Sequence, residues 1–389
     1  MKIVFFTHYS ELYGANKSLI NLIEGLISLY TIQPLVVIPK EGAISSVLKE
    51  KNIPYIVVKF YLWCEIKKKK SLNPYLFIKT VYFASKRIKM LNAFNEQQIC
   101  NLKNELGTFK PDWVYTNSSV FNFGFLFARK YDIKHIWHIR EFGKKDYNLQ
   151  FFNNKRVTDS FNASDRIIAI SNAIKSFYIK KYSINNIFVE YNAVLSLHDL
   201  KIIDKRVESK RVVPSTDIVF GIVGLIHKNK NQEEAISAFK IVNNKYPNTK
   251  LIIVGIGEQE ELKKKINELD LSSKVHFFGH LSDPFDAFLQ MDVNLMCSRN
   301  EGLGRVTIEA MAARIPTIGY KGGGTVEIIQ DNITGLFYKN GFKELSKKMI
   351  YLVENESERN EMGLNARNLF VSKYTSEIYS KKIFEIMTT

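Results

Sequence analysis

Short apolar runs alternate with helix-like segments along most of the chain. The apolar run 2–6 is followed by the helical pattern 15–29, and a second apolar run at 34–39 precedes the helical stretch 43–51. Strand-length apolar runs separated by helices are typical of βαβ units, which build parallel sheets. The same rhythm predicts further strands at 55–58, 112–117, 134–139, 165–171 and 186–194. Between 59 and 110 it gives way to a long, basic and largely helical stretch.

A second series of the same kind begins at residue 217. Its expected strands are 217–224, 250–255, 274–279, 292–297 and 315–319, with helices at 231–246 and 258–269. The tail, 342–389, has the pattern of two or three polar helices. The predicted fold class is therefore α/β, with two facing Rossmann-like doubly wound domains and an interdomain cleft at the carboxyl ends of both sheets.

A polar stretch divides the two series, and 389 residues are too many for one ordinary domain. We expect an N-terminal domain at 1–197, a linker at 198–216 and a C-terminal domain at 217–365. The remaining helix, 366–389, can pack back on the first domain.

The net charge of +16 is concentrated in one place, because eight basic residues and no acidic residue lie between Lys67 and Lys89. A basic surface favours phosphate-rich partners such as nucleic acid, anionic lipid or phosphorylated substrates. The composition of the whole chain is rich in lysine and asparagine, which also raises the net charge. Part of the positive charge is therefore explained without a phosphate-rich partner.

The cysteine pattern and the hydropathy of the chain indicate the cellular compartment in which we expect the protein. Cys64, Cys100 and Cys297 are scattered and lack C-x-x-C spacing, which argues against a disulfide scaffold or a zinc site and fits a reducing compartment. The first residues carry no signal-peptide pattern, and no apolar run is long enough to span a bilayer. We expect a cytoplasmic protein, or one that is peripheral on the inner face of the cytoplasmic membrane.

The stretch 297–310, "CSRNEGLGRVTIEA", carries the most specific chemistry. Gly302 and Gly304 allow the amides at the start of the next helix to point at an anionic group. Glu301 can accept hydrogen bonds from sugar hydroxyls, and Glu309 offers the two oxygens that a ribose diol requires. The alternative is that both glutamates are favoured by the helix dipole, which suits Glu301 better than Glu309.

Two further glycine-bearing segments follow predicted strands. In "GIVGLIHKNKNQ", Gly224 ends a strand, and Lys228 and Lys230 precede a helix, where ammonium groups suit a diphosphate. A solvated loop explains these lysines equally well. In "LIIVGIGEQE", Gly255 permits close approach of a backbone to phosphate or ribose, but Glu260 replaces the third glycine of a dinucleotide fingerprint.

The segment "YKGGGTVEIIQDNITGL" carries three consecutive glycines before a helix, so that its amides can hold a sugar or a phosphate. A flexible turn with ordinary capping is the alternative. This segment, the three segments above, "DRIIAISNAI" and "YNAV" follow one another along the chain in the expected order, and together they closely resemble the family-4 glycosyltransferases of GT-B fold. The resemblance extends from Met1 to about Tyr338 and is looser between 59 and 110.

The resemblance implies a retaining transferase that takes a sugar from a nucleotide donor without a metal or another cofactor. By position, Glu309 would bind the donor ribose, Glu301 the donor sugar, and Lys230 the leaving diphosphate. His138 in "WHIREF" would touch the donor sugar, so that Glu301, His138 and Lys230 form the catalytic set. The implied donor-binding residues are Gly14, Gly224, Lys228, Lys230, Gly255, Arg299, Glu301, Gly302, Leu303, Gly304, Arg305 and Glu309.

On the acceptor side the resemblance implies Arg140 and Glu141. The chain departs from the family at Leu225, where an arginine commonly completes the diphosphate clamp. Lys228, Arg299 or Arg305 would then have to supply the missing charge.

The expected function is transfer of a hexose or an N-acetylhexosamine, from UDP by preference, to a glycan or lipid-linked acceptor in bacterial cell-surface polysaccharide assembly, such as lipopolysaccharide or capsule. The basic segment 67–91 interleaves lysines with aromatic side chains and could lie on an anionic membrane surface, or pack on its own domain. A catalytically weak nucleotide-sugar binder is the alternative suggested by Leu225. A nucleic-acid-binding protein is disfavoured because no such module is visible.

Overall fold

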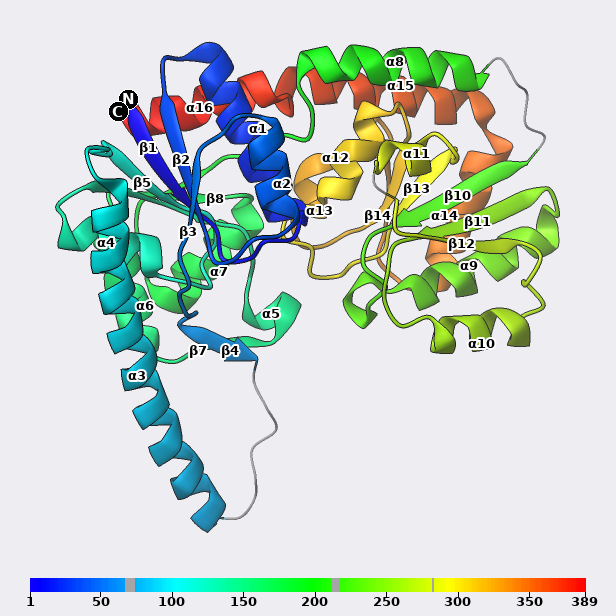
Figure 1. Ribbon diagram of the computed structural model, residues 1–389. Helices are drawn as coiled ribbons and strands as arrows, with labels where there is room; N and C mark the ends of the chain where they lie inside the picture. The colour runs from blue at the N-terminus through cyan, green and yellow to red at the C-terminus, as the bar shows by residue number, and fades with distance from the viewer. Residues whose placement is uncertain (67–73, 212–216, 282) are drawn as a thin grey trace. The chain divides into compact units, whose positions relative to one another are not determined.

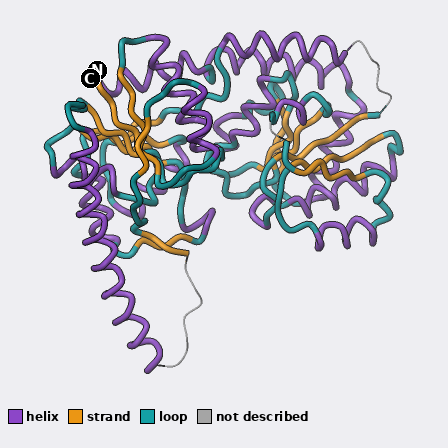
Figure 2. Tube along the Cα trace, viewed as in Figure 1, coloured by secondary structure: helices purple, strands orange, loops and turns teal. Residues whose placement is uncertain are grey.

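The computed structural model describes residues 1–66, 74–211, 217–281 and 283–389. The chain forms two compact units, of which the first comprises Met1–Tyr191 and Ser380–Thr389 and the second Asn192–Tyr379. Each unit has its own parallel sheet with helices packed against it (Figures 1 and 2). The predicted fold class, α/β with two Rossmann-like domains, is confirmed.

The first unit is built on a seven-stranded sheet in the order β3-β2-β1-β5-β6-β8-β9, and every pair in it is parallel. Neighbouring strands that are not consecutive require crossovers, which the helices supply. The strands are β1 (Lys2–Phe6), β2 (Gln33–Ile38), β3 (Tyr55–Val57), β5 (Trp113–Thr116), β6 (Lys134–Ile139), β8 (Arg166–Ala169) and β9 (Ile187–Val189).

Large aromatic side chains fill the core of the first unit. Trp137 of β6 is fully buried, and its ring lies 5.3 Å from that of Trp63 and 4.2 Å from that of Phe161, between centroids. The helices of the first unit are α1 (Gly14–Leu29), α2 (Ala43–Glu50), α3 (Pro74–Leu106), α4 (Phe123–Lys130), α5 (Lys144–Tyr147), α6 (Asn154–Asn162) and α7 (Asn172–Tyr182). Of the basic segment 67–91, residues 67–73 lie outside the described residues.

A small antiparallel sheet interrupts the region that the sequence pattern predicts as helical. Strands β4 (Cys64–Ile66) and β7 (Leu149–Phe151) pair there, and α3 begins eight residues after β4 ends. Three-residue strands give too few positions for a period of two to be seen in the sequence.

The second unit is built on a six-stranded parallel sheet in the order β12-β11-β10-β13-β14-β15. The strands are β10 (Ile218–Val223), β11 (Thr249–Val254), β12 (Val275–Gly279), β13 (Val293–Met296), β14 (Thr317–Tyr320) and β15 (Gly335–Tyr338). Because β10 lies between β11 and β13, the loops that follow these three strands emerge side by side at one edge of the sheet.

One apolar cluster joins this sheet to α9 and α14. Phe239 of α9 and Met349 of α14 are fully buried against Leu251 and Leu295 of the sheet. The helices of the second unit are α8 (Leu197–Arg211), α9 (Gln232–Lys245), α10 (Glu260–Glu268), α11 (Phe285–Phe288), α12 (Arg305–Ala312), α13 (Thr325–Ile328), α14 (Phe342–Glu354) and α15 (Glu356–Lys373), with a short 3-10 turn at Lys228–Lys230.

The stretch 198–216, expected as a linker, holds helix α8 up to Arg211 and belongs to the second unit as far as it is described. Leu200, Ile203 and Val207 are buried at helical spacing, which gives the helix an apolar stripe. The carboxylate of Asp204 binds the guanidinium groups of Arg314 at 2.8 Å and Arg367 at 2.5 Å. A polar composition therefore conceals a helix with a buried apolar stripe, although its Leu197 and Ile202 are exposed.

The last ten residues return to the first unit as the end of α16 (Ser376–Thr388). The Phe384 ring stacks on Tyr30 with centroids 3.7 Å apart, and Ser380 Oγ donates to the carbonyl of Leu22 at 3.3 Å. Arg166 Nε donates to the carbonyl of Ile386 at 3.0 Å. Within the described ranges, no helix combines the length and the apolarity that crossing a bilayer demands.

Candidate functional site

The loops after β10, β11, β13 and β14 carry nearly all the second-unit residues that the sequence singled out. These loops begin at Gly224, Gly255, Cys297 and Lys321, directly after the last residue of each strand. The order of the sheet makes the four strands neighbours, so residues far apart in the sequence meet at its carboxyl edge.

Lys230 and Glu301 form the central ion pair of this edge. The Lys230 ammonium donates to Glu301 Oε2 at 2.7 Å, and the two side chains are 31% and 17% exposed. Burial by itself would raise the pKa of Glu301, but the Lys230 ammonium and hydrogen bonds from Ser298 and the Gly304 amide outweigh it and lower the pKa below its ordinary value. Glu301 is therefore an ionised acceptor held in a fixed position.

The two loops that carry this pair are also joined through their backbones. Ser298 Oγ donates to the carbonyl of Asn229 at 3.0 Å. A Cβ added to Gly224 would lie 3.9 Å from Lys230 Cε, so the loop glycine runs along the stem of the lysine side chain. The structure thus brings Gly224, Lys230 and Glu301 together.

Glu309 lies one turn inside α12 and is buried, with 6% of its side chain exposed. Arg305 Nε donates to Glu309 Oε1 at 2.8 Å, and Arg305 Nη1 donates to the carbonyl of Ala193 at 3.2 Å. The four-residue spacing places both side chains on the same face of the helix. Glu309 is therefore not a freely solvated first-turn glutamate but a buried carboxylate with one charged partner.

Gly304 is the N-cap residue of α12 and has φ +91°, a conformation that favours glycine. The Gly324 amide donates to the carbonyl of Glu301 at 2.7 Å, and a Cβ on Gly324 would lie 2.4 Å from the carbonyl oxygen of Gly302. The triple glycine therefore packs against the Glu301–Leu303 loop. At least one of its amides serves the chain itself and is not offered to a ligand.

Gly255 has a similar structural purpose. It has φ +143°, and an added Cβ would lie 1.9 Å from the carbonyl oxygen of Gly224. Two residues after Gly224, the amide of Ile226 donates to the carbonyl of Ile256 at 2.8 Å. The close backbone approach expected at Gly255 is thus made by the neighbouring loop of the same unit.

Two predicted cations point elsewhere. Lys228 is 87% exposed and lies 3.9 Å from the carboxylate of Glu261. Arg299 lies 3.6 Å from Glu234 Oε1 and over the ring of Tyr320, 5.5 Å from its centroid. Neither contacts the Lys230–Glu301 pair in these interactions.

Glu234 is a residue that the sequence analysis missed. Its side chain is 8% exposed, it accepts from Tyr338 Oη at 3.2 Å and from Asn231 Nδ2, and it faces Arg299. Burial, followed by the nearby Cys297 and Glu234, raises the pKa of the Tyr338 hydroxyl. In the sequence Glu234 is one of two adjacent glutamates in the first turn of α9, and nothing there marks it as the buried one.

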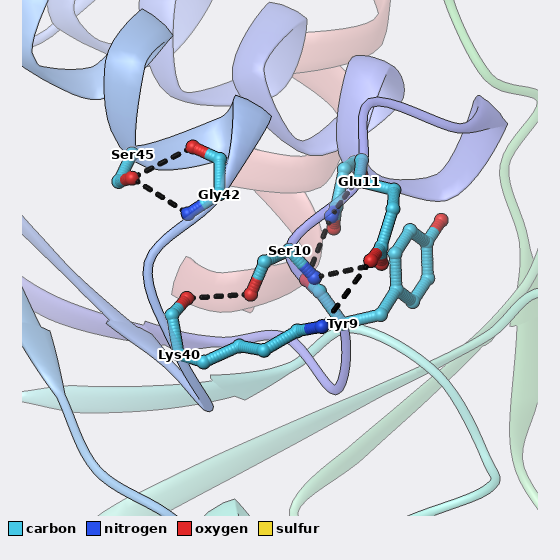
Figure 3. A network of polar contacts seen from close by, with 7 residues as sticks. Tyr9, Ser10, Glu11, Lys40, Gly42 and Ser45 are labelled. Atoms are coloured by element: carbon cyan, nitrogen blue, oxygen red, sulfur yellow. Dashed lines mark hydrogen bonds and ion pairs between the residues drawn. The ribbon is translucent and has the colours of Figure 1, made fainter.

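In the first unit, the loop after β1 is held firmly by the loop after β2 (Figure 3). Ser10 Oγ donates to the carbonyl of Lys40 at 2.5 Å, and Glu11 accepts from the Ser10 amide at 3.2 Å and lies 3.5 Å from the Lys40 ammonium. A Cβ on Gly42 would lie 2.7 Å from Ser10 Cβ, so the two loops touch closely.

Gly14 is the first residue of α1 and is exposed. The N-cap residue, Tyr13, makes no side-chain capping bond. Asn16 fixes the preceding loop by donating to the carbonyls of Tyr9 at 2.9 Å and Glu11 at 2.8 Å. Gly14 therefore stands at a rigidly held helix N-terminus, a position that suits an anion.

His138, Arg140 and Glu141 lie at the end of β6, and all three are buried. His138 Nδ1 shares a hydrogen bond with Tyr115 Oη and lies 3.4 Å from Arg140 Nη2. Burial, and secondly the positive charge of Arg140, hold the pKa of His138 well below its ordinary value, so the ring is neutral near pH 7.

Glu141 binds the loop after β5. Its Oε1 accepts from Ser118 Oγ at 2.9 Å, from the Ser119 amide at 2.7 Å and from Ser119 Oγ. Burial raises the pKa of Glu141 in spite of these bonds. Arg140 Nε donates to Asn117 Oδ1 at 2.5 Å in the same loop. Both side chains predicted for the acceptor side thus have a clear structural use at this edge of the sheet.

No metal site was expected from the sequence. Among the residues that the structure describes, no group of three or more His, Cys, Asp and Glu side chains is arranged to hold a metal ion.

Comparison with known proteins matches residues 204–369 to the family described as "Glycosyl transferases group 1". The capsular polysaccharide biosynthesis glycosyltransferase CapM of Staphylococcus aureus is 29% identical over 238 residues, 59% of this chain and 62% of that protein. The poly(ribitol-phosphate) alpha-N-acetylglucosaminyltransferase of the same species is 24% identical over 68% of this chain and 51% of its own length. The chain thus spans about half to two thirds of these relatives.

Among solved structures, Anabaena HepE in complex with UDP superimposes with a TM-score of 0.78 at 20% identity, covering 100% of both chains. The apo form of the lipopolysaccharide outer core galactosyltransferase WaaB gives a TM-score of 0.69 at 17% identity, covering 100% of this chain and 99% of that one. At these identities the likeness shows the fold, and the GT-B architecture expected from the sequence is confirmed.

Proposed function

We propose that the chain, which carries a glycosyl transferases group 1 domain at 204–369, is a glycosyltransferase of cell-surface polysaccharide assembly. It transfers a hexose or an N-acetylhexosamine from a nucleotide-diphosphate sugar, UDP by preference, to a glycan or lipid-linked acceptor. The observation that carries the proposal is the pairing of Lys230 with Glu301 and of Arg305 with Glu309 at the carboxyl edge of the second-unit sheet.

The leaving diphosphate would be stabilised by Lys230 and by the amides at the start of α12. Charge accumulates on this group as the anomeric C–O bond breaks, and fixed positive charge in a partly buried site lowers that barrier most effectively. Lys230 is already held in place by Glu301, so little reorganisation is needed when the diphosphate arrives. This arrangement leaves no step that requires a metal, and we propose that the enzyme is metal-independent.

Glu309 would hold the donor ribose, because a buried carboxylate can accept from both hydroxyls of a diol. Glu301 would accept from donor sugar hydroxyls next to the reacting carbon. In the first unit, His138 would meet the donor sugar as a neutral ring, in keeping with its lowered pKa, and Arg140 and Glu141 would lie toward the acceptor. The reaction is proposed to proceed with retention of the anomeric configuration.

Leu225 supports one alternative function. The side chain is 48% exposed and stands where the resembled family commonly has an arginine of the diphosphate clamp. A chain that lacks this charge could bind a nucleotide sugar and turn it over only weakly. No nucleic-acid partner is proposed.

The proposed function is tested by titrating UDP into the purified chain by calorimetry, with Glu309→Gln as the variant and Glu361→Gln, an exposed glutamate of α15, as the matched control. Loss of a charge-assisted contact to the diol predicts UDP binding at least about tenfold weaker for Glu309→Gln. The control should bind like the wild type. Equal affinity in all three proteins, or no binding of UDP at all, would overturn the proposed donor site.

Turnover separates the enzyme from the weak binder. Slow hydrolysis of a panel of nucleotide sugars, followed by NMR, should release sugar that keeps its anomeric configuration at first appearance, with or without EDTA. Tight UDP binding without release of sugar from any donor would favour the binding protein. Loss of activity on EDTA treatment, restored by a divalent cation, would contradict metal independence.

A further inference from the structure

Glu234, in the first turn of α9, is a buried carboxylate that the proposed donor site does not use. Its side chain is 8% exposed, and its two oxygens have different partners. Oε2 accepts from Asn231 Nδ2 and, at 3.2 Å, from Tyr338 Oη, whereas Oε1 lies 3.6 Å from the Arg299 guanidinium. Burying a carboxylate is costly unless it is paired and hydrogen-bonded, so these three partners hold the group in one place.

The three partners of Glu234 belong to three different segments of the second unit. Asn231 lies in the loop after β10, Arg299 in the loop after β13, and Tyr338 at the end of β15. Tyr338 is 104 residues away in the sequence. A Cβ added to Gly341, the N-cap residue of α14, would lie 3.6 Å from Glu234 Oε1, so a fourth segment passes close to the carboxylate. Glu234 therefore joins segments that only the fold brings together.

Two of these partners are close neighbours of the Lys230–Glu301 pair in the chain. Asn231 follows Lys230 directly, and Arg299 precedes Glu301 by two residues. The ion pair itself, at 2.7 Å, forms only while the loops after β10 and β13 keep their separation. Glu234 binds one residue of each loop and so bridges the same two loops that the pair bridges.

Local helix capping explains only part of this arrangement. A glutamate three residues after the N-cap residue commonly stabilises the start of a helix. Asn231 is the N-cap residue of α9, and its side chain makes no capping bond to the amides of the first turn but donates to Glu234. The contacts of Glu234 with Arg299 and Tyr338 add nothing to the helix start, because both residues lie outside α9.

We propose that Glu234 is a positioning residue of the donor site, which holds the loops after β10 and β13 so that Lys230 and Glu301 meet. It acts through Asn231 and Arg299 and does not itself touch the substrate. The inference deepens the proposed function and rests on it, since this pair is the one proposed to receive the diphosphate and the donor sugar. A misplacement of about 1 Å in such a group can reduce a rate roughly 100-fold.

The first test follows the titration of the Glu301 carboxyl group by NMR of the full chain without nucleotide. In the wild type, burial opposes ionisation, but the Lys230 ammonium keeps the pKa of Glu301 below its ordinary value. Glu234→Leu removes the three contacts, and the pKa of Glu301 should rise as Lys230 moves away. Loss of the negative charge of Glu234 alone would shift this pKa in the opposite direction, so a rise reports displacement of the pair.

The matched control is Glu233→Leu, the same change at the adjacent residue. Glu233 lies in the same helical turn, its side chain is 68% exposed, and its partner is Lys265 at 2.8 Å. The pKa of Glu301 should stay as in the wild type. Glu234→Gln keeps an acceptor oxygen for Asn231 and should restore most of the wild-type titration, which a change of charge alone would not do.

UDP titration by calorimetry of the same proteins measures the consequence for the donor site. We expect UDP to bind at least about tenfold more weakly to Glu234→Leu, and nearly as tightly to Glu234→Gln as to the wild type. Glu233→Leu should bind UDP like the wild type. If Glu234→Leu does not fold, Asn231→Gly replaces it, because glycine tolerates the φ of +55° at this position and removes one link between the loops.

The proposal is overturned if the pKa of Glu301 is unchanged in the folded Glu234→Leu or Asn231→Gly variant, or if Glu233→Leu raises it equally. A lower free energy of unfolding without a change in the Glu301 titration would give Glu234 a structural role only. Failure of the wild type to bind UDP would contradict the proposed function, and the titration without nucleotide would still decide whether Glu234 positions the pair.

Discussion

Glu301 shows how a buried carboxylate is kept charged at a site built to receive an anion. Burial alone would favour the neutral acid, and the ammonium of Lys230 reverses that preference. Lys230 in turn depends on Glu301 to offset its own partial burial. Each charge therefore offsets the cost of burying the other, and removing either side chain leaves an uncompensated buried charge.

This interdependence predicts the behaviour of Lys230→Met. Without its ammonium partner, 2.7 Å away, the Glu301 carboxylate stays buried and its pKa rises. We expect a loss of about 1–3 kcal/mol in the free energy of unfolding. Because the pKa of Glu301 is lowered in the native state, the pair stabilises at neutral pH, and this stability disappears as the pH falls below the ordinary carboxyl range.

Urea unfolding at neutral and acidic pH measures the effect, with Lys230→Met/Glu301→Gln as the matched double variant. Removal of the orphaned charge should restore part of the stability, and the difference between single and double variants should vanish in acid. If the double variant is as unstable as the sum of both single variants, the two side chains are not coupled.

At the scale of the elements, glycines decide how closely the strand-end loops approach. Gly255 touches the carbonyl of Gly224, and Gly324 touches that of Gly302. In the sequence both positions resemble ligand-binding turns. In the structure their first use is to let two adjacent loops pack backbone against backbone, which fixes the positions of Lys230 and Glu301.

Gly255→Ala tests this use, with Gly279→Ala as the control from the same unit. Both glycines have positive φ, +143° and +65°, but an added Cβ would meet the Gly224 carbonyl oxygen at 1.9 Å in the first case and no atom within 4 Å in the second. We expect Gly255→Ala to cost at least about 3 kcal/mol and Gly279→Ala about 1 kcal/mol. Equal costs in chemical denaturation would show that the loop contact is not required.

At the scale of the whole molecule, the end of the chain completes the first unit. Glu190, directly after β9, is buried, and its Oε2 lies 3.6 Å from the Lys382 ammonium of α16. Burial is the main cause that raises the pKa of Glu190 to about 7; Lys382 opposes the rise and Glu385 adds to it. A group whose folded pKa is raised in this way costs stability when it ionises.

The free energy of unfolding should therefore fall as the pH rises from about 4.5 to about 7, by on the order of 3 kcal/mol for this one group. Glu190→Gln removes the titrating carboxyl group and should flatten the plot of unfolding free energy against pH. Glu385→Gln changes an exposed residue of α16 and should leave that plot as in the wild type. The thermal midpoint of the first unit, measured across this range, is the readout. An unchanged slope in Glu190→Gln would assign the titration to another group.

The sequence by itself determined the type and order of most elements. Alternation of apolar runs with helical patterns predicted β1, α1, β2 and the strands β10 to β14 of the second unit to within a few residues, because burial on one or both faces leaves a local period, but it did not predict β15. It also placed Glu301, Gly304 and Glu309 around the start of one helix.

Only the tertiary structure decided which of these residues meet. Lys230 and Glu301 are 71 residues apart and become partners because β10 and β13 are neighbours in the sheet. The helix α8 in the polar stretch, the buried Glu234 and the return of the chain end to Glu190 depend in the same way on distant partners. Local periodicity reports that a residue is buried, but the identity of the group that faces it depends on how the strands are ordered, which no short window of sequence contains.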